Sequence, residues 1–196
     1  PPFFVAGAVF AGFAMVVTLG VPLRQLFGLQ DFITEKHLDN MGKVMLATGM
    51  IVVYGYAAEI FFAWYSKNPF DIYMVLNRIE GPYRYVWFAL ILCNAVAIQA
   101  LWWTKVRTSV VGIMIVSMFV NVGMWLERFI IVITSLHRDF MPSSWDMYYP
   151  TRWDWAIFIG SLGLFLTLML VFIRVLPSIS IFEIRMLLPG AKGGEK

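Results

Sequence analysis

"GKVMLATGMIVVYGYAAEIFFAWY", residues 42–65, is apolar along almost its whole length and carries one carboxylate, Glu59. About 20 apolar residues in an α-helix are enough to span the hydrocarbon core of a bilayer. The stretch therefore predicts a transmembrane helix. The carboxylate needs a physical explanation, because an ionised group inside the membrane costs roughly 3 kcal/mol or more.

The rest of the chain has the same apolar character. Of 196 residues, 60% are hydrophobic and 14% are charged, whereas a soluble domain is about 45–50% apolar. The apolar runs lack the alternation of a barrel, and an open strand cannot satisfy its backbone in lipid. We therefore expect an all-α integral membrane protein with five transmembrane helices, forming a four-helix bundle plus one peripheral helix at 154–176, whose apolar stretch 155–173 carries no charge. The predicted helices cover roughly 3–24, 42–65, 83–104, 108–136 and 154–176.

Lys and Arg are distributed unevenly between the two sides that these helices define. The positive-inside rule places the richer side in the cytoplasm. We therefore expect a multi-pass protein with a cytoplasmic C-terminus and external connections at 66–82 and 137–153. Basic residues beside helices favour anionic lipid, so they indicate no nucleic-acid partner. The richer side carries Arg24, Lys36, Lys43, Lys105, Arg107, Arg174, Arg185, Lys192 and Lys196, and the other carries Lys67, Arg78, Arg84, Arg138 and Arg152.

Both predicted external connections mix aromatic and charged residues, as in "HRDFMPSSWDMYYPTRWDW", residues 137–155. Trp and Tyr are typical of membrane interfaces, and aromatic residues with Arg are also typical of protein interfaces. The connections are thus either an interfacial belt or a platform for external subunits. On the other side, Thr34 with His37 three residues later predicts a helix start.

Polar residues inside two predicted helices follow helical spacing. Counted from the external helix ends, Glu59 lies about 9 Å and Glu127 about 12 Å inside the membrane. We expect Glu59, Glu127 and Arg128 to face the interior of the bundle, because burying them together keeps them from lipid. One stripe is Thr48, Val52, Gly55, Tyr56 and Glu59, and the other is Ser117, Asn121, Trp125 and Arg128.

Adjacent residues on a helix do not face one another, so we expect Glu127 and Arg128 to have different partners. A contact between Glu59 and Arg128 would leave Glu127 free to exchange protons. The other interpretation is an ion pair that only fixes the register of the helices. Asn94 and Gln99 predict hydrogen bonds between helices.

We expect no redox cofactor, metal or cluster to be bound by this chain. Its two histidines, His37 and His137, fall near opposite membrane faces, and Cys93 is its single cysteine. These residues do not provide a ligand set for haem, copper or an iron–sulfur cluster. A quinol suits a layer of carboxylates, because its oxidation releases protons that Glu59 and Glu127 could accept and pass outward.

Three segments resemble a known family. They are the stretch from "FVAGAVFAGFAMVV" to "AAEIFFAWYS" at 4–66, "WLERFIIVITSLHRDFMPSSWDMYYPT" at 125–151, and "LPSISIFEI" at 176–184. They are similar to the NrfD-like (polysulfide reductase membrane subunit) family. More narrowly, they resemble the C-terminal half of the larger NrfD-like subunit of bacterial alternative complex III.

The resemblance implies a subunit without redox centres in a quinol:electron acceptor oxidoreductase of the bacterial inner membrane, in a respiratory or photosynthetic chain. Menaquinol or ubiquinol would be the substrate. The whole subunit would have ten helices, in two four-helix bundles plus two outer helices. This chain would be a single membrane domain over 1–196. The implied partners are an external iron–sulfur protein and multihaem cytochrome c, carrying the clusters and haem c, together with a second NrfD-like subunit and lipids.

In this family the quinol pocket is associated mainly with the other bundle, and the bundle resembled here with proton movement. The positions inside "YGYAAEIFF" and "WLERF" therefore imply roles for three residues. Glu127 would be a proton acceptor or relay, Arg128 an electrostatic partner, and Glu59 a second relay group. Two other functions stay open: an ion or solute transporter that uses the same charged layer, and a purely structural membrane anchor.

Overall fold

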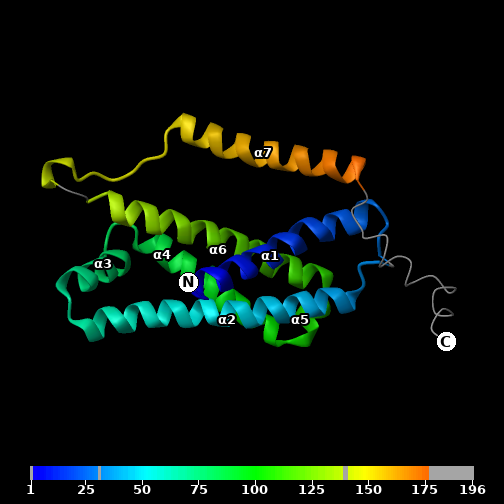
Figure 1. Cartoon of the computed structure of the whole chain (residues 1–196), viewed down its shortest axis with the longest axis horizontal. Helices are drawn as coiled ribbons and strands as arrows, with labels where there is room; N and C mark the ends of the chain where they lie inside the picture. The colour runs from blue at the N-terminus through cyan, green and yellow to red at the C-terminus, as the bar shows by residue number, and fades with distance from the viewer. Residues whose placement is uncertain (1, 31, 139–140, 177–196) are drawn as a thin grey trace. The chain divides into compact units, whose positions relative to one another are not determined.

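The computed structural model describes residues 2–30, 32–138 and 141–176, and these segments are predominantly helical (Figure 1). The prediction of an all-α fold is confirmed. Among the described residues, five helices are long and apolar enough to cross a membrane. They are α1 (Pro2–Leu26), α2 (Glu35–Ser66), the continuous segment α4 (Arg84–Ile91), η1 (Leu92–Val96) and η2 (Ala97–Trp102), then α6 (Val110–Leu136) and α7 (Arg152–Val175).

The chain divides into two compact units, Pro1–Met147 and Tyr148–Lys196. The first unit contains the helices from α1 to α6 and the short helix η3 (Pro142–Ser144). The second contains α7, whose start is capped by Thr151: its Oγ1 accepts a hydrogen bond from the Asp154 amide, 3.3 Å away. No residue of α7 is buried. Its peripheral position, and the single membrane domain, stay predictions.

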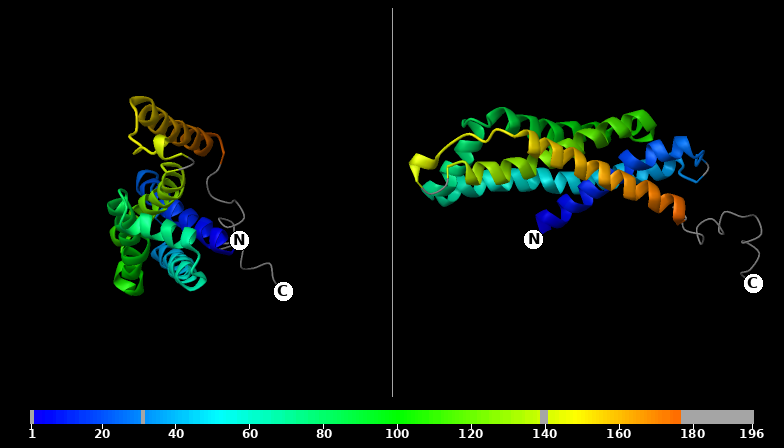
Figure 2. Two further views of the ribbon diagram at one scale, coloured as in Figure 1. Left: turned by 90° about the vertical axis from the view of Figure 1, so that its left-hand side faces the viewer. Right: turned by 90° about the horizontal axis from the view of Figure 1, so that it is seen from above.

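Three helices of the first unit pack through positions that repeat every seven residues. This period is typical of helical bundles, because it keeps one seam of each helix facing its neighbours. Figure 2 shows α1 crossing α2 obliquely within this arrangement. The inward positions are Phe3, Gly7, Phe10, Ala14, Val17 and Val21 in α1; Leu38, Gly42, Met45, Gly49, Val52, Tyr56 and Ala63 in α2; and Ile113, Val116, Val120, Gly123, Glu127, Ile130, Thr134 and His137 in and after α6.

Glycines in these seams allow close approach. A Cβ at Gly49 would overlap the Ile98 side chain and lie 2.9 Å from Cε2 of Phe10. Because no larger residue fits there without displacing its neighbours, α2 packs directly against α1 and the η2 segment. Small residues play the same part in many membrane helix pairs.

We expected an α-helix over 83–104, but this segment is α-helical only in its first part. It begins as α4, widens into the π-helix η1 and tightens into the 3-10 helix η2. π-helical turns rotate the following side chains and are frequent at functional sites. Here η1 contains Cys93 and Asn94, which are 6% and 0% exposed. The irregular turn therefore places an amide in the centre of the bundle.

The predicted connection at 66–82 is largely a helix, α3 (Pro69–Ile79). Asn68 caps it by accepting a hydrogen bond from the Phe70 amide at 3.2 Å, and Pro69 occupies the first helical position, where a proline is favourable. We call this end of the first unit, where α2 ends and α4 begins, the α3 end (Figure 1).

The short helix α5 (Thr104–Thr108) lies toward the opposite end, where α2 begins. Arg107 Nε donates to Asp39 Oδ1 at 2.8 Å, which ties the turn before α6 to α2. The predicted start of α2 is confirmed, since the Thr34 amide donates to Nδ1 of His37 at 3.2 Å and the helix begins at Glu35.

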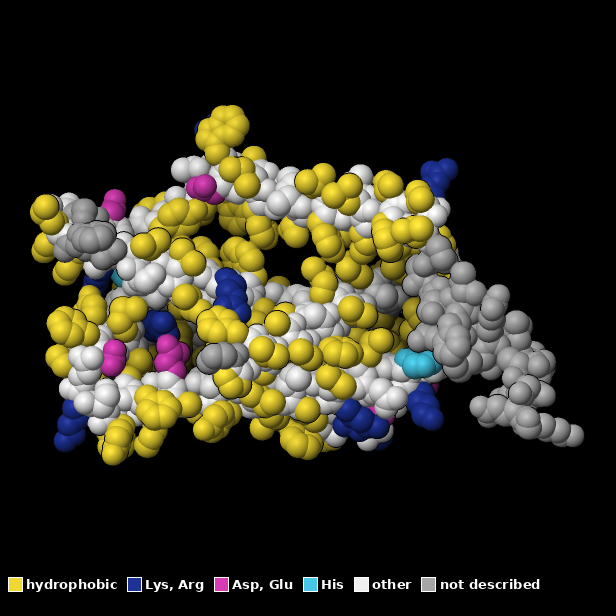
Figure 3. Space-filling view, in the orientation of Figure 1, with side chains coloured by type: hydrophobic (Ala, Val, Ile, Leu, Met, Phe, Trp, Pro, Cys, Tyr) yellow, Lys and Arg dark blue, Asp and Glu magenta, His cyan; other side chains and the backbone are white. Residues whose placement is uncertain are grey.

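Outside the seams, the described helices are covered by apolar side chains. Hydrophobic groups dominate the face in Figure 3, with few charged side chains along the helices. This surface suits lipid or other membrane helices and not water.

Candidate functional site

Glu127 is the most deeply buried ionisable side chain in the first unit's membrane helices, with a residue exposure of 3%. It stands in the seam of α6, seven residues after Val120 and fourteen after Ile113. A carboxylate thus occupies a core position of the kind that aliphatic side chains fill elsewhere in this helix. Burying it is costly unless other polar groups surround it.

Tyr56 provides the first of these groups. Its hydroxyl donates to Glu127 Oε2 at 2.5 Å, and the same hydroxyl accepts from Nδ2 of Asn94 at 2.9 Å. The three residues come from α2, α6 and η1, so the polar chain joins three helices. Each is held in place by its helix, and the π-helical turn brings Asn94 into reach.

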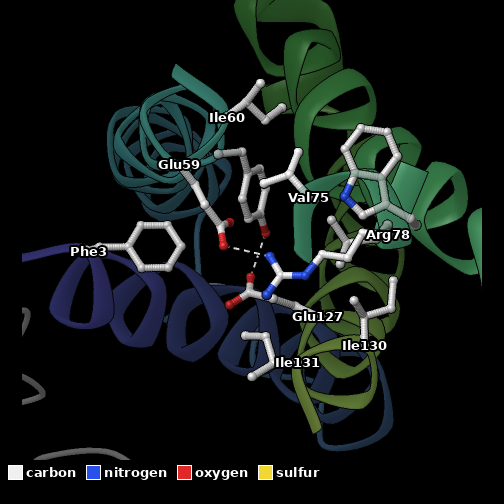
Figure 4. Close-up of a pocket in the computed structure, with 11 residues that line it drawn as sticks. Phe3, Glu59, Ile60, Val75, Arg78, Glu127, Ile130 and Ile131 are labelled. Atoms are coloured by element: carbon white, nitrogen blue, oxygen red, sulfur yellow. Dashed lines mark hydrogen bonds and ion pairs between the residues drawn. The ribbon is translucent and has the colours of Figure 1, made fainter. Parts of the chain in front are cut away.

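Glu59 forms an ion pair with Arg78 from α3. Nη1 of Arg78 lies 2.6 Å from Oε1 of Glu59, and their side chains are 15% and 52% exposed. Arg78 stands in the last turn of α3, so this capped helix directs a guanidinium toward the bundle. In Figure 4, the Arg78 guanidinium points toward both Glu59 and Glu127.

A small cavity connects the two carboxylates. Its volume is about 60 Å³, and Figure 4 shows Glu59, Arg78 and Glu127 directed into it from three helices. A buried water needs on the order of 10–15 Å³ of such space, so a few waters fit. The apolar part of the wall is made by Phe3, Ile60, Val75, Trp87, Leu90, Ile130 and Ile131.

Several buried polar atoms near this cavity lack a hydrogen bond to any described residue. They are Glu127 Oε1, Arg78 Nε and Asn94 Oδ1. Buried polar groups without a protein partner normally bind ordered water. The cavity therefore has the space and the polar atoms to bind water between a buried carboxylate and the Glu59–Arg78 pair.

The structure corrects the expected position of Arg128. Its side chain is 48% exposed, and it does not line the cavity with Glu127 and Glu59. The buried positions of α6 repeat every 3.5 residues, whereas the predicted stripe from Ser117 to Arg128 follows a spacing of eleven. The two periods diverge along a helix, so Ser117 is buried and Arg128 turns outward.

The expected pair between Glu59 and Arg128 is also wrong, because Glu59 pairs with Arg78. Arg128 lies closest to its own neighbour: Nη2 is 3.5 Å from Oε1 of Glu127. The prediction that these two residues have different partners holds only in part: Oε2 of Glu127 accepts from Tyr56, but Oε1 of Glu127 is the ion-pair partner of Arg128. The long Arg side chain reaches across the angular separation of adjacent positions.

The prediction that Glu127 and Glu59 share one cavity is confirmed. Asn94 makes the expected contact between helices. Gln99 does so as well, through Nε2 to Sδ of Met50 in α2 at 3.6 Å, and the same nitrogen also lies 2.9 Å from the Ala95 carbonyl oxygen of its own segment. Sequence reasoning missed Arg78, because it falls in a segment expected to be an external connection. An N-cap before Pro69 and a basic last turn were the signals of α3.

The arrangement suits transfer of protons and not binding of a large solute. A carboxylate, a phenol and waters can pass a proton by short hydrogen-bonded steps. Pockets for organic ligands usually exceed about 300 Å³, several times the size of this cavity. No group of three or more His, Cys, Asp or Glu within the described ranges is placed to hold a metal ion.

The sequence matches no protein-family model, and a search of curated proteins finds no match. What is established is therefore an all-helical, multi-pass membrane chain with five candidate spans and a buried carboxylate beside a water-sized cavity.

Proposed function

We propose that this chain is the proton-handling membrane subunit of a quinol:electron acceptor oxidoreductase, with Glu127 as the group that binds and releases the proton. One observation carries the proposal: Glu127 is 3% exposed, yet its Oε1 has no hydrogen bond to a described residue and it faces a cavity of about 60 Å³. The contact of Oε1 with Arg128 is an ion pair at 3.5 Å without a hydrogen bond, so this oxygen can still bind a cavity water.

The proposed proton path begins at the quinol and leads to the α3 end. Oxidation of a quinol yields a quinone, two electrons and two protons. The electrons go to redox centres in partner subunits, and a proton binds the Glu127 carboxylate. Cavity water then connects Glu127 to the Glu59–Arg78 pair, where Glu59 is half-exposed toward the α3 end. Tyr56 holds the carboxylate in position throughout.

The surroundings of this site suit the resemblance to the NrfD-like family. We propose a bacterial inner membrane, with the C-terminus in the cytoplasm and the α3 end outside. An iron–sulfur protein and a multihaem cytochrome c would dock at that end, and a second NrfD-like subunit would lie in the membrane. Exposed Phe70, Tyr73, Leu76 and Trp145 provide apolar area for docking.

Turnover of variants in the assembled complex tests the proposal. Glu127→Gln keeps the shape of the side chain but cannot carry a proton, so quinol-dependent turnover should fall by about 10²-fold or more, the size expected for loss of a proton-transfer group. The complex should remain assembled.

Glu35→Gln is the matched control. Glu35 is exposed at the start of α2, it does not line the cavity, and it is separated in sequence from the cavity-lining residues of that helix. It should retain full turnover. Unchanged turnover and pH profile in Glu127→Gln would reduce Glu127 to a structural ion site and remove the proposal.

A further inference from the structure

Arg128 is the only charged residue on the exposed face of α6. Most of its exposed neighbours are apolar, and they include Val122, Trp125 and Val132, which are 51%, 44% and 54% exposed. Ser135, two turns further on, is also exposed, and its hydroxyl donates to the Ile131 and Val132 carbonyl oxygens. The adjoining start of α1 is apolar as well, with Phe4 and Val5 at 60% and 64% exposure. A single guanidinium thus stands in the middle of an apolar surface formed by two membrane helices.

The contacts of Arg128 with the described residues leave most of its donors unused. Nη2 lies 3.5 Å from Glu127 Oε1, and the guanidinium lies 5.5 Å from the centre of the Phe4 ring. The other oxygen of Glu127 accepts from Tyr56, so this carboxylate is not available as a two-oxygen partner. A guanidinium presents five N–H donors and is best satisfied by a carboxylate that binds with both oxygens.

Lipid is a poor solvent for this side chain. Arg128 lies eight residues before the end of α6, which corresponds to about 12 Å along the helix. A charged side chain at such depth normally faces protein or water, unless it extends toward the headgroups. Here the guanidinium is directed sideways to Glu127 and Phe4 and not along the helix.

From this geometry we infer that the α1–α6 face, defined by Phe4, Val5, Trp125, Arg128 and Val132, binds a transmembrane helix from outside this sequence that carries an Asp or Glu at the depth of Arg128. Charge complementarity selects the carboxylate, and the apolar residues around Arg128 pack against the helix. The helix α7 offers no carboxylate at this depth, because its one carboxylate, Asp154, is in its first turn. This inference does not depend on the proton-transfer role of Glu127.

Photocrosslinking from Val132 tests the inference in native membranes. Val132 lies one turn from Arg128 on the same face, and p-benzoylphenylalanine at this position should crosslink to a membrane-spanning peptide outside residues 1–196 with an Asp or Glu at matching depth. Peptide mass spectrometry identifies the product. Adducts only with phospholipid, with α7, or with a helix that has no carboxylate would overturn the inference.

A second substitution tests the role of the charge. Adding Arg128→Leu should reduce the yield of the crosslink by about tenfold, as expected when one partner of a membrane ion pair is removed. Adding Val122→Leu, which changes an apolar residue of the same face, should leave it unchanged. Equal yields with and without Arg128 would contradict recognition by charge. The identity of the product from the single Val132 variant remains decisive if the double variant does not assemble.

Discussion

The Tyr56 hydroxyl donates a hydrogen bond to Glu127 Oε2, although the two residues are 71 positions apart in the chain. This contact connects α2 to α6 in the middle of an apolar bundle. The same hydroxyl accepts from Asn94, so one oxygen atom joins three helices. Both the stability of the bundle and the position of the proposed proton carrier depend on it.

Tyr56→Phe should therefore weaken the fold and the activity together. It leaves Glu127 Oε2 and the Asn94 amide without their shared partner, which should cost about 1–3 kcal/mol of stability. Turnover should fall because the carboxylate is no longer held toward the cavity. Thermal unfolding in detergent and turnover measure the two effects. Tyr54→Phe, at a 72% exposed position of the same helix, should change neither.

The Glu59–Arg78 pair predicts a local effect at the α3 end. Arg78→Gln removes the partner 2.6 Å from Glu59, so the exit of the proposed proton path loses its fixed geometry. We expect lower turnover with an assembled complex, and a similar loss in Glu59→Gln. Because the two side chains act as a pair, the double variant should lose little more than either single one. Additive losses would show that they act independently.

Arg84→Gln is the control for this pair. Arg84 is also a basic residue near the α3 end, but it is exposed and contacts the Tyr85 hydroxyl, not Glu59. Its substitution should preserve turnover. A loss equal to that in Arg78→Gln would indicate that general positive charge at this end matters more than the specific pair.

Gly123→Ala tests the packing that supports Asn94. A Cβ at Gly123 would overlap the amide oxygen of Asn94 and lie 2.7 Å from Cβ of Cys93. Overpacking of this kind typically costs about 1–3 kcal/mol, and it should also move Asn94 away from Tyr56. Gly12→Ala is the matched control, since a Cβ there meets nothing within 4 Å. Equal thermal midpoints for the two variants would contradict the tight π-helical packing.

The Arg107–Asp39 ion pair predicts a structural effect without a catalytic one. The two side chains are 12% and 16% exposed and 2.8 Å apart. Arg107 and Asp39 are both only slightly exposed, so solvent screens their attraction less than that of a surface pair, and Arg107→Gln should lower the thermal midpoint clearly. Lys43→Gln should lower it much less, because Lys43 pairs with the same Asp39 but is 55% exposed. Comparable losses would show that burial does not decide the difference.

The sequence was sufficient to predict the five membrane helices, because each is an apolar run of the length that a bilayer requires. It also predicted that Glu59 and Glu127 meet in one cavity, since charges at similar depth have few other places to be buried. The cost of placing a charge in lipid was enough to predict that Glu59 and Glu127 face the interior of the bundle.

The sequence did not predict that the Arg128 side chain is half-exposed or that the Arg78 side chain points into the bundle. An eleven-residue spacing put Arg128 on the same face as Ser117. A seven-residue spacing along α6 would instead have placed Glu127 on the buried face, with Ile113 and Val120. Arg78 reaches the site through α3, whose path depends on contacts distant in sequence. The π-helical turn at Asn94 likewise has no clear local signal, because it depends on packing against Gly123.

The most direct test of the central claim is an infrared difference spectrum of the assembled complex, recorded before and after addition of quinol. If Glu127 changes its protonation during turnover, a carboxyl band sensitive to deuterium exchange should appear in the native protein. The band should be absent in Glu127→Gln and present in Glu35→Gln. A carboxyl band that is the same in all three proteins would contradict the claim that Glu127 carries the proton.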